Sequence, residues 1–169
     1  MNHTKIIQLL ISILFIAPIS CSQKKDPEFL FFKLGSTAGD FGKDIELSNV
    51  TPSEINNSDT FKRYNYQKSV YLDKTLLNFV LFFKNDTLVQ IVGFFSCIPK
   101  KDTVYQYILK KHGNPTTIRK VYDEFLKDSI NIIEWHKKGY LISYKKESNS
   151  TINGEQQMRI YIQRFNNPH

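Results

Sequence analysis

The sequence predicts a single α+β domain in which an antiparallel sheet of about five to seven strands carries two short helices on one face. Three observations support this fold class. Runs rich in Phe, Val, Leu and Ile recur along the chain and are separated by turn residues. One segment carries both start and stop signals for a helix. Once an N-terminal leader is set aside, about 150 residues remain, which suits one domain.

The clearest helix is expected over residues 103–112. Asp102 is a good N-cap, and Gly113 ends the segment. The last turn carries two lysines and His112, and cations there favour the helix dipole, which accounts for this histidine without any chemistry. A weaker helix is expected over residues 36–45, where two glycines lower the helix propensity.

Strands are expected over most of the remaining sequence, and two hairpins are the clearest of them. Asn85 and Asp86 suit a tight turn between two apolar runs, and a second turn is expected at residues 137–139. The polar stretches 48–60 and 147–157 are expected to be surface loops. The expected strands are residues 68–72, 77–83, 88–95, 118–125, 130–136, 140–145 and 158–163.

The N-terminal segment has the pattern of a secretory signal. A short basic start is followed by the apolar run Ile6–Ile16, then by Pro18, Ser20 and Cys21. A helix that spans a membrane needs roughly 20 apolar residues, so this run suits a cleaved signal better than a permanent anchor. The alternative is an ordinary secreted protein in which Cys21 has no special role.

Ile19, Ser20 and Cys21 resemble the lipobox of bacterial lipoproteins, although Pro18 stands where that family usually has Leu. The resemblance implies that the Cys21 thiol receives a diacylglyceryl group, that the chain is cut before Cys21 and that the new amine is acylated. Ser22–Asp26 resembles the export tag of surface lipoproteins of the Bacteroidota, or is a plain solvated tether.

This resemblance implies a chain of three parts. Residues 1–20 would be a cleaved lipoprotein signal peptide, residues 21–29 the acylated cysteine and a flexible tether, and residues 30–169 a single α+β domain. The implied location is the bacterial cell envelope, anchored by lipid in the outer membrane and facing the periplasm or the cell surface, because several acyl chains hold a protein stably on a bilayer.

Positive charge is concentrated in the second half of the chain. Residues 22–99 hold nine basic and nine acidic side chains, whereas residues 100–169 hold thirteen and seven. The excess predicts either a face for anionic headgroups or an acidic protein, or a merely solvated surface. Nucleic acid is not an expected partner, because no RNA-binding signature occurs.

The sequence contains few groups arranged for catalysis. Glu134 and His136 are two apart on an expected strand, so they face the same side and could share a proton. Because Lys137 and a turn follow directly, an exposed surface pair is the plainer interpretation. Asp40 and Asp44 would share one face of the weaker helix, where they could bind a cation or act as an acid and base pair, or simply form a solvated face, which is the plainer interpretation. Cys97 lies in an apolar run and is expected to be a buried small hydrophobic residue. We therefore expect no catalytic residue, no cofactor and no metal, and only Cys21 as a modified site.

Abundant aromatic residues are expected mainly in the core, although Tyr140, Tyr144 and Tyr161 are spaced to form a platform for sugar or peptide. The segment Lys110–Ile118 resembles the helix exit of small envelope lipoproteins of the SmpA/OmlA type and of the related β-lactamase-inhibitor-like fold, and Phe32–Phe41 resembles their other helix start. That resemblance implies a noncatalytic scaffold that binds proteins. We predict such a lipid-anchored binding module, with an immunity or inhibitor lipoprotein or a small envelope hydrolase as alternatives.

Overall fold

A computed structural model describes residues 28–48, 61–98, 101–124, 127–152 and 155–165. Cys21, the predicted signal peptide and most of the predicted tether lie outside these residues, as does nearly all of the predicted loop 48–60. Strand β1 begins at Glu28, inside the segment that we assigned to the tether, and Phe29 is buried in the core. The folded domain therefore includes the last two residues of that segment.

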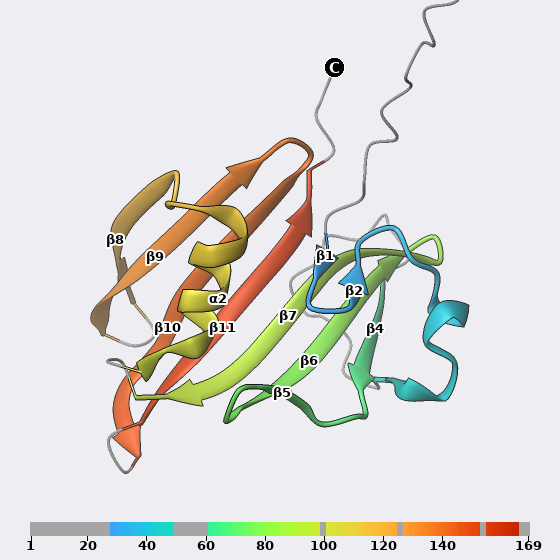
Figure 1. The fold of residues 1–169 in the computed structure, drawn as a ribbon, viewed down its shortest axis with the longest axis horizontal. Coiled ribbons are helices and arrows are strands. Elements are labelled where there is room, and N and C mark those ends of the chain that lie inside the picture. Colours follow the sequence, from blue (N-terminus) through green and yellow to red (C-terminus); the bar gives the residue numbers. More distant parts are fainter. Residues whose placement is uncertain (1–27, 49–60, 99–100, 125–126, 153–154, 166–169) are drawn as a thin grey trace, which may run out of the picture.

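The described chain forms one open antiparallel sheet of nine strands and a separate two-stranded hairpin (Figure 1). The hairpin pairs β1 (Glu28–Phe29) with β2 (Phe32–Lys33). The order of strands in the large sheet is β3-β4-β6-β7-β11-β10-β9-β8, and β5 pairs with the first part of β6. The strands of this sheet are β3 (Ile45–Leu47), β4 (Phe61–Tyr66), β5 (Val70–Leu72), β6 (Thr75–Lys84), β7 (Thr87–Cys97), β8 (Thr117–Asp123), β9 (Asp128–Lys137), β10 (Tyr140–Ile152) and β11 (Glu155–Arg164).

The predicted fold class is therefore wrong. We expected an α+β domain with five to seven strands and two short helices, but the protein is mostly β, with nine strands in its main sheet. Two expectations failed for local reasons. Residues 147–157 were expected to form a surface loop, but most of them belong to strands. Strand β10 extends to Ile152 and β11 begins at Glu155, because these two strands pair with each other beyond the ranges that we predicted. Phe61–Tyr66, for which we predicted no element, pairs with both β3 and β6.

The second expected helix forms only in part. Ala38–Asp44 is a 3-10 helix, η1, and Gly42 interrupts it with φ 53° and ψ −121°. Glycine adopts this backbone conformation readily, and it also lowers helix propensity. Regular helix is therefore interrupted at residue 42. The helix predicted at residues 103–112 is confirmed as α2 (Thr103–His112). Its N-cap Asp102 accepts a hydrogen bond from the Tyr105 amide at 2.9 Å.

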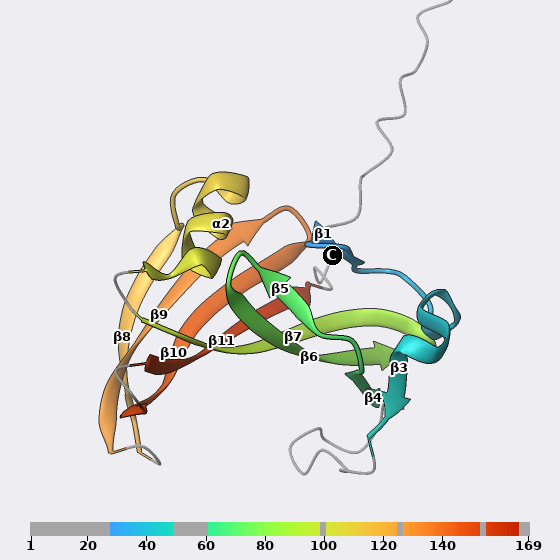
Figure 2. The ribbon, with the colours of Figure 1, turned by 60° about the horizontal axis from the view of Figure 1, so that its bottom comes forward.

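Elements outside the sheet pack on one of its faces, and Figure 2 shows α2 and the β1–β2 hairpin on the same side. The Trp135 indole donates a hydrogen bond to the Gly113 carbonyl at the end of α2, at 2.8 Å. The Phe32 ring packs against Phe79 of β6, with their centroids 4.7 Å apart. The core therefore lies between the sheet and these elements, with Val104 and Ile108 of α2 fully buried in it.

The opposite face of the sheet carries the side chains that alternate with these core residues. Among the described parts of the chain, α2, η1 and the β1–β2 hairpin all contact the core side instead. We call this second surface the open face. It includes Val80, Phe82, Val92, Phe94, Arg159, Tyr161, Ser143, Lys145, Ile132, Glu134 and Arg119.

Candidate binding surface

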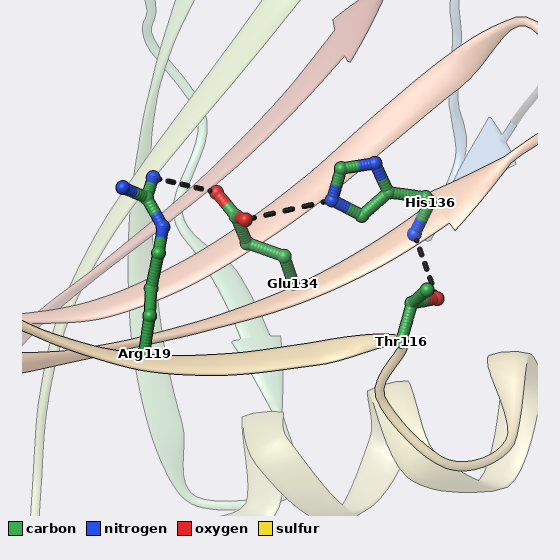
Figure 3. Close-up of polar contacts among 4 residues, drawn as sticks. All are labelled: Thr116, Arg119, Glu134 and His136. Carbon is green, nitrogen blue, oxygen red and sulfur yellow. Dashed lines mark hydrogen bonds and ion pairs between the residues drawn. The ribbon is translucent and has the colours of Figure 1, made fainter.

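Glu134 and His136, which the sequence places on the same side of a strand, do come together on the open face. The Nε2 atom of His136 lies 3.5 Å from Oε2 of Glu134, and Arg119 of the neighbouring strand β8 places Nη2 3.0 Å from Oε1 of the same carboxylate. Figure 3 shows Glu134 between these two partners. The His136 amide also donates a hydrogen bond to Oγ1 of Thr116 at 3.1 Å. Sequence reasoning missed Arg119, because its position depends on how β8 and β9 align.

The electrostatics of this cluster keep Glu134 ionised. Burial by itself would raise the pKa of the Glu134 carboxyl group, but the hydrogen bond and charge of Arg119, assisted by His136, outweigh burial and lower the pKa. A carboxylate held in an ion pair with an arginine is a poor general acid. The arrangement is therefore an ion pair between a buried carboxylate and a half-exposed arginine.

Asp40 and Asp44 do not join that cluster. Asp40 accepts a hydrogen bond from the Thr37 amide at 2.7 Å and so caps the start of η1. Asp44 pairs with Lys68, with 2.6 Å between Oδ2 and Nζ. Each aspartate thus has a local partner near the β3 edge of the sheet, whereas Glu134 lies on β9 near the opposite edge.

Cys97 is a buried free thiol, as predicted from the sequence. Burial, followed by the nearby carboxylate of Asp102, raises the pKa of this thiol to about 12. Because the thiolate is the reactive form, Cys97 is inert at neutral pH. Asp102 also accepts a hydrogen bond from the Tyr144 hydroxyl, and burial raises the pKa of this carboxyl group above its ordinary value.

His112 ends α2 but does not act there as a cation. Burial and the neighbouring charges of Lys111 and Lys137 lower the pKa of its imidazole to about 4. The charge at this helix end comes instead from Lys137, whose Nζ donates a hydrogen bond to the His112 carbonyl at 2.8 Å. The imidazole packs against Tyr140, and Lys110 and Lys111 are the other basic residues of this last turn.

The three tyrosines proposed as a platform are separated by the fold. Tyr144 is buried on the core side, and Tyr140 is half-buried against His112. Tyr161 alone of these three projects onto the open face, where it is paired with Val92 and Ser143. They do not form one platform, but Tyr161 joins a different arrangement.

One line of residues runs across six strands of the open face. Direct pairing across β6, β7, β11, β10, β9 and β8 places these residues side by side. We call this line the transverse row, and its members in order are Asn78, Phe94, Arg159, Lys145, Ile132 and Arg119. It contains three cations, of which Arg119 is paired with Glu134.

Aromatic rings hold the two central cations of the transverse row. The Arg159 guanidinium lies 4.6 Å from the centroid of Phe94 and 5.6 Å from that of Tyr161. The Lys145 ammonium lies 5.3 Å from the same Tyr161 ring, and Arg159 Nη1 donates a hydrogen bond to the Tyr161 hydroxyl at 2.7 Å. Such contacts restrict the rotamers of the two side chains but do not neutralise their charge.

A hollow of about 530 Å³ opens where the transverse row begins. Asn78 and Phe94 of the row line it, together with Ser96 and Gln157 of the same face, whose side chains are joined by a hydrogen bond of 2.6 Å. Its other lining residues include apolar and charged side chains at the ends of β6 and β7.

Comparison with family models, with curated proteins and with solved structures finds no match. The resemblances to bacterial lipoproteins and to the SmpA/OmlA type therefore stay predictions. In the residues that the structure describes, no helix is long and apolar enough to cross a membrane. Within the same residues, no three His, Cys, Asp or Glu side chains form a group that could hold a metal ion.

Proposed function

We propose that this protein is a lipid-anchored lipoprotein of the bacterial envelope that acts without catalysis and binds a protein partner through the open face of its sheet. The observation that carries the proposal is the asymmetry of the sheet. One face is covered by α2 and the β1–β2 hairpin, and the other carries the transverse row, in which one aromatic and three cationic side chains lie in register with Asn78 and Ile132. Aromatic residues and arginine are the types enriched at protein interfaces.

The proposed anchor rests on the sequence pattern that ends at Cys21. Fractionation of cells that carry Cys21→Ala tests it, since the acyl groups can be attached only at this thiol and the amine beside it. We expect the wild-type protein in the membrane fraction and the variant released, with mass spectrometry showing a lipid-modified Cys21 at the new N-terminus. A variant that stays with the membrane, together with an unmodified wild-type thiol, would refute the anchor.

The proposed binding surface is tested with a photo-crosslinking amino acid in intact cells. One probe replaces Gln163, which pairs with Gln90 and Leu141 on the open face. The control probe replaces Gln106, an exposed glutamine of α2 on the other side of the sheet. We expect the probe at Gln163 to capture one defined protein and the probe at Gln106 to capture none. Equal capture at both positions, or capture only from α2, would refute the proposal.

A small envelope hydrolase is the alternative from another class, and the separation of Glu134 from Asp40 favours the binding protein over it. Glu134 is engaged by Arg119, and Asp40 caps η1 near the other edge of the sheet. An immunity or inhibitor lipoprotein would use the same kind of binding surface, and the identity of the captured protein distinguishes it from a general scaffold.

A further inference from the structure

Strand β8 (Thr117–Asp123) forms one edge of the main sheet (Figure 1). Among the strands that the structure describes, it pairs with β9 alone. It has seven residues, whereas β3 at the opposite end of the strand order has three. An edge strand presents backbone N–H and C=O groups that its own sheet does not pair, and these groups can bind a further strand.

Two hydrogen bonds fix which backbone groups of β8 point outward. The Glu134 carbonyl of β9 accepts from the Thr116 amide at 2.8 Å, and the His136 amide donates to Oγ1 of Thr116 at 3.1 Å. Even-numbered residues of β9 therefore direct their backbone groups towards β8. In an antiparallel pair, directly opposed residues alternate between facing each other and facing away. Because Glu134 pairs with Thr117, the odd-numbered residues of β8 bond to β9, and the even-numbered ones direct their N–H and C=O groups outward.

The even-numbered residues of β8 are Ile118, Lys120 and Tyr122, and their side chains share one face of the sheet. Ile118 pairs with Ile133, which packs against the core, so this is the core side of the sheet. The side chains are nevertheless accessible, since Ile118 is 65% exposed, Tyr122 is 59% exposed and Lys120 is exposed between them. Within the described residues, we find no hydrogen bond or ion pair of the Lys120 side chain.

Lys120 determines which strand can pair with this edge. If a second copy of β8 paired antiparallel so that Ile118 met Tyr122, Lys120 would lie directly opposite Lys120. Like charges in that position destabilise a sheet, so this lysine disfavours self-association. An acidic side chain opposite Lys120 would form a favourable cross-strand pair instead. Apolar residues two positions to either side of that acid would cover Ile118 and Tyr122.

We infer that β8 binds an extended segment of another protein as an additional strand of the main sheet. The segment pairs antiparallel with β8, with an acidic residue opposite Lys120 and an apolar residue opposite each of Ile118 and Tyr122. In this mode of recognition, main-chain hydrogen bonds supply affinity and alternate side chains supply specificity. The inference goes beyond the proposed function, because these three side chains lie on the side of the sheet that is opposite to the open face.

Fluorescence anisotropy with the full-length protein and defined peptides tests this inference. The probe is a labelled Thr-Val-Thr-Glu-Thr-Val-Thr peptide, which matches β8 in length and places its acid at the centre. The first comparison peptide has Lys in place of Glu. The second is N-methylated at the Glu amide, which faces β8 in the antiparallel pairing, and the third is N-methylated at the next Thr amide, which faces away.

We expect the Lys peptide and the peptide methylated at Glu each to bind at least ten-fold more weakly than the probe. The peptide methylated at Thr is the matched control, and its affinity should stay within two-fold of the probe. Equal binding of the two methylated peptides would overturn the inference, because it would exclude the backbone pairing. Equal binding of the acidic and basic peptides would also overturn it, and so would a probe that does not bind.

Variants at Lys120 place the peptide on β8. We expect Lys120→Glu to weaken binding of the acidic probe at least ten-fold and to strengthen binding of the Lys peptide. Lys120→Pro removes an outward N–H group without breaking the ladder to β9, so it should bind the probe more weakly than Lys120→Ala, which keeps that group. Lys138→Glu, at an exposed residue of the turn between β9 and β10, is the matched control and should stay within two-fold of wild type. Circular dichroism and a melting curve separate lost binding from lost folding, and unchanged binding in folded Lys120→Glu would overturn the inference.

Two further outcomes separate this inference from a different occupant and from the proposed function. If sedimentation shows a dimer of the wild-type protein that Lys120→Pro abolishes, β8 binds a second copy and the inference fails. If the probe peptide does not bind but the crosslinker at Gln163 still captures one protein in cells, the inference fails and the proposed function stands. If the peptide binds at β8 and the crosslinker at Gln163 captures nothing, the proposed function fails and the inference stands.

Discussion

Lys145 and Arg159 occupy directly opposed positions on adjacent strands, and both place their cationic groups over the ring of Tyr161. Lys145→Glu replaces this like-charge pair with an opposite-charge pair. We predict that the free energy of unfolding rises by about 0.5 kcal/mol, as is typical of a cross-strand charge pair. Urea unfolding measures this change, with Lys120→Glu as the control that should be near zero. A loss of more than about 1 kcal/mol would mean that Lys145 is retained for stability.

Gly93 lies where the sheet leaves no room for a side chain. A Cβ atom at this position would be 2.8 Å from Ile160 Cγ2 and 2.8 Å from Phe79 Cε1. We predict that Gly93→Ala lowers the free energy of unfolding by about 1 to 3 kcal/mol through overpacking. Gly39→Ala is the matched control, since its nearest atom would be Thr37 Oγ1 at 3.6 Å and its effect should stay within about 0.5 kcal/mol. Equal effects at both glycines would contradict the packing that we describe.

Trp135 joins the sheet to the end of α2. Its ring is fully buried and its indole donates to the Gly113 carbonyl. Trp135→Phe removes this hydrogen bond and leaves a cavity, so we predict that the free energy of unfolding falls by about 2 to 3 kcal/mol. Because Trp135 is the only tryptophan, its emission in the wild type should be blue-shifted and resistant to acrylamide quenching. Emission like that of free tryptophan in the folded protein would place the ring in solvent and refute this docking.

His112 should make the stability depend on pH. Its pKa falls from 6.5 to about 4 on folding, so the unfolded chain binds more protons between these values. The stabilisation is complete above pH 6.5 and is lost as the pH falls towards 4. We predict a loss of about 1 to 2 kcal/mol from this group, after allowance for its partial exposure. In His112→Gln, the free energy of unfolding should fall less steeply between pH 7 and pH 4.5 than it does in wild type. Identical slopes would mean that His112 does not contribute to the pH dependence of stability.

Local signals predicted much of the secondary structure. Asn85 and Asp86 do form the turn between β6 and β7, with φ of 47° and 60°, and Asp102 and Gly113 bound α2 as expected. Gly42 interrupts the first expected helix, which forms only as a 3-10 helix. Polar composition misled us at residues 147–157, because a strand whose partner supplies backbone hydrogen bonds need not be apolar.

The candidate surface could not be derived from the sequence, since it depends on which strands are neighbours. Glu134 and His136 could be placed on one side of a strand by their spacing. The ion pair with Arg119 requires the register of β8 and β9, and the approach of Phe94, Arg159 and Lys145 requires β7, β11 and β10 to be adjacent. These pairings join residues 14 to 65 positions apart, beyond the range of periodicity.

The most direct test of the account is capture in intact cells from the probe at Gln163, measured in wild type, Lys145→Glu and Lys120→Glu backgrounds. If the open face binds a protein partner, one crosslinked protein forms in wild type and in Lys120→Glu, and its yield falls at least ten-fold in Lys145→Glu, which reverses a charge in the middle of that face. Equal yields in all three backgrounds would contradict binding at the part of the open face around Lys145, and no product in wild type would contradict the binding face itself.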